Sequence, residues 1–240
     1  MKLKVLSWNI WQGNKLDLII EFLKNAKADI IALQEVIEKD DTNTAAIIAE
    51  ALGYKLVYYP AIQENTFGVP QGNAILSKYP IIESKPHLLS DISLYVNTPE
   101  SEPRIAVETT IRVNGVSIKV FSVHLAYSHA FGPSRMRDLQ IDNLLKLLPH
   151  SRTILMGDFN SYPDSKSLEK VSDVMKNTDT KLTEPTWTIY PFDYGEFRET
   201  ELRHRLDYIY VSKDVHVENF RVEQSRGSDH LPISAIAHVK

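Results

Sequence analysis

The segment from residue 105 to residue 124 constrains the fold more than any other part of the sequence. Apolar and polar side chains alternate over residues 105–113 and again over residues 116–124, and Asn114-Gly115 separates the two runs. An Asn-Gly pair between alternating runs is the strongest local signal for a two-residue β-hairpin. The sequence therefore predicts an antiparallel strand pair here, which argues against a purely parallel, doubly wound sheet.

Other short apolar runs predict further strands, and few segments have helical spacing. Strands are expected at residues 3–10, 29–36, 54–59, 73–77, 205–212, 215–224 and 231–239 and in the run "TILMGDFN" (153–160), and helices at residues 15–27, 43–52, 134–148 and 165–176. Many strands with few helices between them favour two packed sheets with helices outside. No linker or low-complexity tract interrupts the chain, so residues 1–240 are expected to form one domain.

Composition excludes several function classes. The 240 residues contain no cysteine, which rules out disulfides, thiolate metal sites and cysteine nucleophiles. The net charge of −4 gives no general attraction to nucleic acid, although a bound cation would supply local positive charge. No membrane-spanning apolar run or signal peptide is visible, so we expect a cytoplasmic protein, as a monomer.

Polar side chains recur where the predicted strands end. Each alone fits a solvated turn or a structural histidine, and "GDFN" alone fits an Asx turn. Strand ends at one edge of a sheet sandwich converge, so together these side chains are expected to line one pocket. They are Asn9, Glu35, His124, Asp158 with Asn160, Asp207, and Asp229 with His230.

This donor set indicates a particular chemistry. Carboxylates and an amide without thiols suit a hard cation such as Mg²⁺, and the two histidines would also permit Mn²⁺ or Zn²⁺. A hard cation beside an Asp/His pair suits attack of water on phosphorus, because the metal offsets phosphoryl charge while a carboxylate orients the water.

Seven motifs in order resemble the endonuclease/exonuclease/phosphatase family, which includes deoxyribonuclease I. They are "SWNIW", "LQEV", "GNAILSKYP", "SVHL", "GDFN", "LDYIYV" and "GSDHLPI", from Asn9 to Pro232. The resemblance implies an α/β fold, a four-layer αββα sandwich of two mixed β-sheets flanked by helices. It also implies a phosphoesterase that depends on Mg²⁺ or Mn²⁺.

The resemblance also implies roles for individual residues. Glu35 would be the principal metal ligand, helped by Asn9 and Asp229. Asp158 would orient or deprotonate the attacking water, and Asn160 would bind a phosphate oxygen.

The remaining roles concern the phosphate. His230, oriented by Asp229, would stabilise the pentacovalent phosphorus. His124, paired with Asp207, would contact the phosphate or act as the acid. Arg104 would bind substrate, or is a surface arginine that opens a strand.

Features beside the motifs bear on the substrate. Trp11 and residues 126–134 are expected to flank the pocket, where aromatic rings could stack on substrate or pack between loops. The same two interpretations hold for the aromatic loop 183–204. Arg135 and Arg137 could hold a second phosphate, or be solvated helix residues.

These features leave three functions open. The leading hypothesis is a nuclease or nucleotide-diester hydrolase acting on a phosphodiester. The alternatives are a lipid or inositol/sugar phosphoesterase, and a catalytically silent binding module on the same fold.

Overall fold

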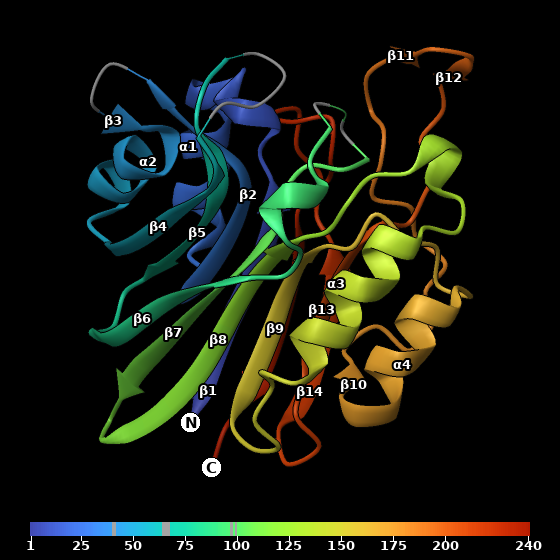
Figure 1. The fold of residues 1–240 in the computed structure, drawn as a ribbon. Helices are drawn as coiled ribbons and strands as arrows, with labels where there is room; N and C mark the ends of the chain where they lie inside the picture. The colour runs from blue at the N-terminus through green and yellow to red at the C-terminus, as the bar shows by residue number, and fades with distance from the viewer. Residues whose placement is uncertain (40–41, 64–67, 97, 99) are drawn as a thin grey trace.

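Two β-sheets pack face to face, and helices cover the outer face of each sheet (Figure 1). The computed structural model describes residues 1–39, 42–63, 68–96, 98 and 100–240. The first sheet has the order β14-β15-β1-β2-β5-β4, with β3 paired to β2, and the second has the order β10-β13-β9-β8-β7-β6. This arrangement confirms the expected four-layer sandwich.

The strands of the first sheet are β1 (Lys2–Asn9), β2 (Ile30–Lys39), β3 (Thr42–Asn43), β4 (Lys55–Ile62), β5 (Gln71–Ser77), β14 (His216–Val222) and β15 (Ile233–His238). Those of the second sheet are β6 (Ile81–Leu88), β7 (Ile105–Val113), β8 (Val116–His124), β9 (Thr153–Asp158), β10 (Lys176–Asn177) and β13 (Asp207–Val211). A separate hairpin consists of β11 (Phe192–Tyr194) and β12 (Phe197–Glu199), and the helices are α1 (Leu16–Ala26), α2 (Thr44–Leu52), α3 (Arg135–Leu145) and α4 (Lys166–Val174). Three short 3₁₀ turns cover Trp11–Gly13, Ile92–Leu94 and His129–Phe131.

The core lies in three layers, because both faces of each sheet are buried. One layer lies between the two sheets, and one lies between each sheet and its helices. β-Branched and other apolar side chains of both sheets, such as Val5, Ile30 and Ile154, fill the space between the sheets. The outer face of the first sheet packs against Ile19 and Leu23 of α1 and against residues of α2. Residues of α3 and α4 cover the second sheet in the same way.

Local signals set the helix ends. The side chain of Asn43 caps α2 by accepting a hydrogen bond from the backbone N–H of Ala46 at 2.8 Å, and Gly53 ends the helix with a left-handed φ of 70°. Ser134 and Ser165 cap α3 and α4 in the same manner. Among the helices of the described residues, none is both long and apolar enough to cross a membrane.

Several elements differ from expectation, among them the following three. The second strand continues to Lys39, so Glu35 lies inside β2 and not at its end. β6 was not predicted, because this edge strand is mostly exposed and contains Pro86. The loop predicted at 183–204 contains the β11–β12 hairpin, which projects beyond the sandwich (Figure 1).

The first sheet brings the two chain ends together. β15 pairs antiparallel with β1, and Lys2 lies opposite His238. Figure 1 shows the two termini side by side below the sandwich. β1 is therefore a central strand, flanked by β15 and by the parallel strand β2.

Candidate active site

Register places three of the predicted side chains on neighbouring strands of the second sheet. β8 and β9 run parallel, and His124 is the partner of Asp158 at their carboxyl ends. β13 runs antiparallel to β9, and its first residue, Asp207, is also opposite Asp158. Asp158 thus lies at the centre of a row of three.

A bulge in the first sheet directs Glu35 to the same region. The pairing of β2 with β5 shifts between Leu33 and Val36, and Glu35 has a φ of 55°. This left-handed conformation costs a non-glycine residue about 1–2 kcal/mol, and such strain is typical of functional sites. Gln34, one position earlier, is buried and donates to Ser122 Oγ at 3.1 Å, across the two sheets.

Asn9, at the end of β1, connects the two sheets at this point. Its Nδ2 donates to Glu35 Oε1 at 3.0 Å and to Asp158 Oδ2 at 3.1 Å. Its Oδ1 accepts the backbone N–H of Trp11 at 3.1 Å, which fixes the orientation of the amide. Asn9 therefore presents its nitrogen to the carboxylates, and its expected part as a metal ligand stays a prediction.

The structure corrects the expected partner of His230. His230 Nδ1 lies 2.9 Å from Oδ2 of Asp207, whereas the resemblance paired Asp207 with His124. Burial disfavours the charged imidazole, but the charges of Asp207, Asp158 and Asp229 outweigh burial and raise the pKa of His230 to about 10. His230 is therefore cationic at neutral pH, with Nε2 3.6 Å from Asp158 Oδ2.

The second correction concerns Asp229, which was expected to orient His230. Its Oδ2 accepts a hydrogen bond from Trp187 Nε1 at 2.8 Å, and its Oδ1 accepts from Ser228 Oγ at 3.2 Å. Isolated β-bridges of Trp187 with His204 and His230 fix the backbone at this position. Asp229 is thus positioned by the 183–204 segment.

His124 pairs with Arg104. Arg104 Nη1 lies 3.0 Å from His124 Nδ1, and because arginine can only donate, Nδ1 must accept and the proton of the imidazole must sit on Nε2. Burial, then the charges of Arg104 and His230, hold the pKa of His124 well below its usual value. His124 is therefore neutral, with Nε2 3.6 Å from Asp158 Oδ2.

Asn160 combines both interpretations of "GDFN". Its backbone N–H donates to Asp158 Oδ1 at 2.9 Å, which is an Asx turn, and its Nδ2 donates to the carbonyl of Leu125 at 2.9 Å. Its φ of 48° is one that asparagine tolerates. Both side chains are nevertheless buried, so this turn shapes the site instead of facing water.

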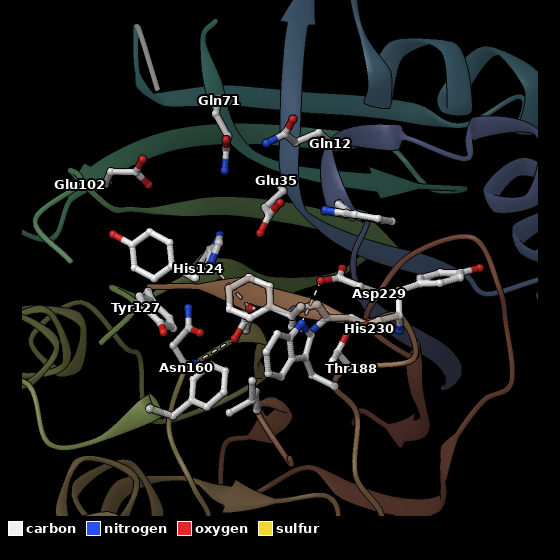
Figure 2. Close-up of a pocket in the computed structure, with 18 of the residues that line it drawn as sticks. Gln12, Glu35, Gln71, Glu102, His124, Tyr127, Asn160, Thr188, Asp229 and His230 are labelled. Carbon is white, nitrogen blue, oxygen red and sulfur yellow. Dashed lines mark hydrogen bonds and ion pairs between the residues drawn. The ribbon is translucent and has the colours of Figure 1, made fainter. Parts of the chain in front are cut away.

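These side chains surround a pocket of about 290 Å³ at the edge where the sheets meet. Figure 2 shows Glu35, His124, Asn160, Asp229 and His230 directed toward its centre. Of the predicted site residues, the lining includes Trp11, Glu35, Arg104, His124, Asp158, Asn160, Asp229 and His230. Asn9 and Asp207 do not line the pocket and are fully buried behind it.

Negative charge accumulates in this pocket. Burial raises the pKa of Glu35, and the neighbouring carboxylates of Asp229 and Asp158 raise it further. Burial and the charge of Asp207 likewise raise the pKa of Asp158, although His230 opposes them. Buried carboxylates that repel one another fit a cation, and their oxygen donors suit a hard one.

A second group of donors lies deeper. Asp158, Asp207 and His230 each offer one ligand atom, and these atoms lie within 4.8 Å of one another, so the group could hold a metal ion. Within this group, Oδ2 of Asp207 and Nδ1 of His230 already lie 2.9 Å apart in a hydrogen bond.

Two expectations about basic and aromatic residues can now be judged. Arg137 is buried, with Nη1 donating to the carbonyl of Ala126 at 3.2 Å and to Ser128 Oγ at 3.0 Å, so it supports a loop and cannot hold a second phosphate.

Trp187 was expected only as one of many loop aromatics, and no local pattern marked it as the partner of Asp229. Glu102, two residues before Arg104, was missed, and it accepts from Arg104 Nη2 at 3.0 Å.

Solved structures confirm the fold. An endonuclease/exonuclease/phosphatase from Beutenbergia cavernae is 19% identical, with a TM-score of 0.81 over 99% of this chain and 72% of the other. A mannosyl-6-phosphatase from Bacteroides thetaiotaomicron is 21% identical, with a TM-score of 0.72 over 98% and 99% of the two chains. The human Nocturnin catalytic domain, solved with a bound sulfate anion, is 20% identical, with a TM-score of 0.71 over 100% and 94%. At these identities the likeness is one of fold.

Sequence comparison identifies the family. A search of curated proteins gave no match. The family model described as the Endonuclease/Exonuclease/phosphatase family matches residues 6–230, which includes every side chain of the pocket described above. Members of this family are phosphoric ester hydrolases. With that match and a four-layer sandwich whose pocket gathers the family's motifs, the chain belongs to the endonuclease/exonuclease/phosphatase family.

Proposed function

We propose that this protein hydrolyses a phosphate ester with the help of a divalent cation, by in-line attack of water on phosphorus. The observation that carries the proposal is the charge arrangement of the pocket. A cationic imidazole, His230, is held by the buried Asp207 and lies beside Asp158, in a site that otherwise carries excess carboxylate charge.

The metal would be held by Glu35 and Asp229, with Asn9 orienting the Glu35 carboxylate through its amide nitrogen. Bound there, Mg²⁺ or Mn²⁺ would offset negative charge on the phosphoryl oxygens and on the leaving oxygen. Trp187 donates to Oδ2 of Asp229, and among the described residues the hydrogen bond to Oδ1 comes from the Ser228 hydroxyl.

The protein's own groups would handle the water and the phosphoryl oxygens. Asp158 would orient the attacking water and accept its proton, since the raised pKa of its carboxyl suits a general base. His230, through Nε2–H, would donate to the phosphoryl oxygen that gains charge. His124 and Arg104 would donate to the remaining oxygens, the neutral histidine through Nε2–H.

Two candidate substrates differ in the leaving group of the ester. A nuclease or nucleotide-diester hydrolase remains the hypothesis from sequence, and a sugar phosphatase is the rival, supported by the similar fold of a mannosyl-6-phosphatase. A silent binding module would not need His230 to be held by a buried carboxylate beside Asp158.

Hydrolysis of chromogenic esters tests the proposal. Purified protein would be assayed with p-nitrophenyl phosphate and bis-p-nitrophenyl phosphate in Mg²⁺, in Mn²⁺ and in EDTA. We expect turnover that EDTA abolishes and that Asp158→Asn reduces at least about 10²-fold. The exposed Asp164 provides the matched control, Asp164→Asn, which should retain full activity. Turnover of neither ester in either metal would refute the proposal.

A further inference from the structure

The pocket has few groups that could bind a phosphate by positive charge. Among the described residues that line it, Arg104 is the one permanent cation, with His124 and His230 beside it, and no lysine is present. Arg104 contacts His124 and Glu102, and its Nε is buried without a hydrogen-bond partner. This set can neutralise one phosphate group, and a nucleic acid strand brings another with each nucleotide.

Two basic residues near the pocket already have contacts of their own. Arg137 is used inside the protein, and Lys15 lies over the ring of Tyr190, with Nζ 4.6 Å from its centre. Glu102 lines the opening instead. An extended polyanion would be repelled here.

The remaining walls combine rings with amides. Trp11 stacks on Tyr190 with ring centres 5.7 Å apart, and Tyr127 meets Tyr194 edge-on at 5.9 Å. Figure 2 shows Gln12, together with Gln71 and Glu102, along one side of the opening. Amides donate to and accept from hydroxyls and carboxylates accept from them, while aromatic faces cover the apolar C–H faces of a ring.

These features, taken with the proposed function on which the inference rests, lead us to propose the substrate class. The substrate is a small ester of a single phosphate, and its leaving group is a neutral polyol of about the size of one sugar. The volume of about 290 Å³, at the lower end of the range for small-molecule sites, agrees with one sugar and one phosphate. Arg104 and the two histidines hold the phosphate, and Gln12 contacts the hydroxyls.

A substrate series tests this inference on the intact protein in Mg²⁺. The series contains hexose 6-phosphates, cyclohexylmethyl phosphate as the analogue without hydroxyls, a single-stranded and a duplex oligonucleotide, and the two p-nitrophenyl esters. We expect kcat/KM for at least one hexose phosphate to exceed that of the analogue at least tenfold, because a site built to bind hydroxyls rejects a ligand without them.

The outcomes separate the two proposals. Equal kcat/KM for the sugar phosphate and the analogue, or a higher kcat/KM for an oligonucleotide, would overturn the substrate inference while chromogenic turnover still upheld the proposed function. Absence of turnover with both chromogenic esters would refute the proposed function and this inference with it.

A variant pair adds a test at one residue. Gln12→Ala should raise KM for the preferred hexose phosphate about tenfold, the effect of losing one hydrogen bond, and should lower kcat/KM for this substrate by more than it lowers kcat/KM for p-nitrophenyl phosphate. Gln224→Ala, at an exposed glutamine that does not line the pocket, should change neither value. An equal loss with both substrates in Gln12→Ala would show that Gln12 supports the site and does not recognise the sugar.

Discussion

At the scale of single residues, Asp207 gives His230 its charge. Asp207→Asn keeps the shape of the side chain and removes the nearest negative charge, so the pKa of His230 should fall from about 10 toward its ordinary value. At pH 8 His230 would then lose its proton, and kcat should drop about 10²-fold or more. An NMR titration of the imidazole, with the rate measured at the same pH values, checks both effects.

The exposed Asp193 offers a control for this prediction. Asp193→Asn should alter neither the titration of His230 nor the rate. If Asp207→Asn instead shifted the titration of His124 and left His230 unchanged, the pairing expected from the family resemblance would be restored and the structural pairing would be wrong.

Trp187 provides a second prediction at this scale. Trp187→Phe keeps an aromatic ring against Phe131 and Phe192 but removes the N–H that donates to Asp229. Loss of a group that orients a metal ligand typically weakens metal affinity about 10–100-fold. The Mn²⁺ affinity of Trp187→Phe, measured by calorimetry, should therefore weaken by about this factor. Trp11→Phe, whose ring stacks on Tyr190, should leave Mn²⁺ affinity unchanged. Equal affinities in the two variants would contradict a positioning role for Trp187.

Residue types alone did not predict the partners of the site's side chains. Six of the side chains expected together line one pocket, and Asn9 and Asp207 lie buried behind it. Their partners depend on register and depth, which no local pattern carries: the β9–β13 register brings Asp207 opposite Asp158, and His230 reaches Asp207 from the other sheet. Trp187 could not be found because its contact spans 42 residues.

At the scale of elements, the close approach of β8 and β9 holds His124 beside Asp158. A Cβ at Gly157 would lie 2.0 Å from the backbone oxygen of Val123, so the two strands could not keep their spacing. Gly157→Ala should cost more than about 2 kcal/mol in urea unfolding and reduce activity. Gly53→Ala, where a Cβ meets nothing within 4 Å but φ is 70°, should cost about 1 kcal/mol and leave activity unchanged. Equal losses in the two variants would argue against a tight strand contact.

The β11–β12 hairpin depends on a buried carboxylate at its end. Burial would raise the pKa of Glu199, but hydrogen bonds from the Glu201 and Thr200 backbone, His204 and Arg203 outweigh burial and lower it to about 2. Because the pKa of Glu199 is lower in the folded protein, the Glu199 carboxylate stabilises the fold fully at pH values above its unfolded pKa of 4.5. This stabilisation is lost as the pH falls toward 2.

Glu199→Gln tests this linkage. The variant should be less stable than the wild type by about 1–3 kcal/mol at pH 7, and the difference should shrink as pH falls from 4.5 toward 2. Chemical denaturation at a series of pH values measures it, with Glu196→Gln, on the exposed turn of the same hairpin, as control. A difference that is constant with pH would show that the Glu199 charge does not hold the hairpin.

Elements were predictable where their signal is local. The hairpin at 105–113 and 116–124 has the expected boundaries, because alternation and Asn-Gly specify both strands and the turn. β6 escaped prediction, since its mixed, exposed face and Pro86 resemble a loop until β7 supplies hydrogen-bond partners. The bulge at Glu35 was missed for a similar reason, as only pairing with β5 reveals it.

At the scale of the whole molecule, the pocket's carboxylates oppose folding until a cation binds. Mn²⁺ at about 100 times its Kd should stabilise the wild type by about 2.7 kcal/mol. Glu35→Gln should be more stable than the wild type in EDTA, because it removes a buried charge, and should gain little from Mn²⁺. Thermal unfolding with and without Mn²⁺ measures both, with the exposed Glu21→Gln as control. Full stabilisation of Glu35→Gln by Mn²⁺ would place the metal elsewhere.

The position of β15 between β14 and β1 has a consequence for protein synthesis. A ribosome makes β1 first and β15 last, yet β1 needs β15 on one edge to complete the sheet. The loop before β15 also carries Asp229 and His230, so these two side chains of the pocket are among the last to be made. A nascent chain therefore holds β1 with one unpaired edge until β15 has been made and can pair with it.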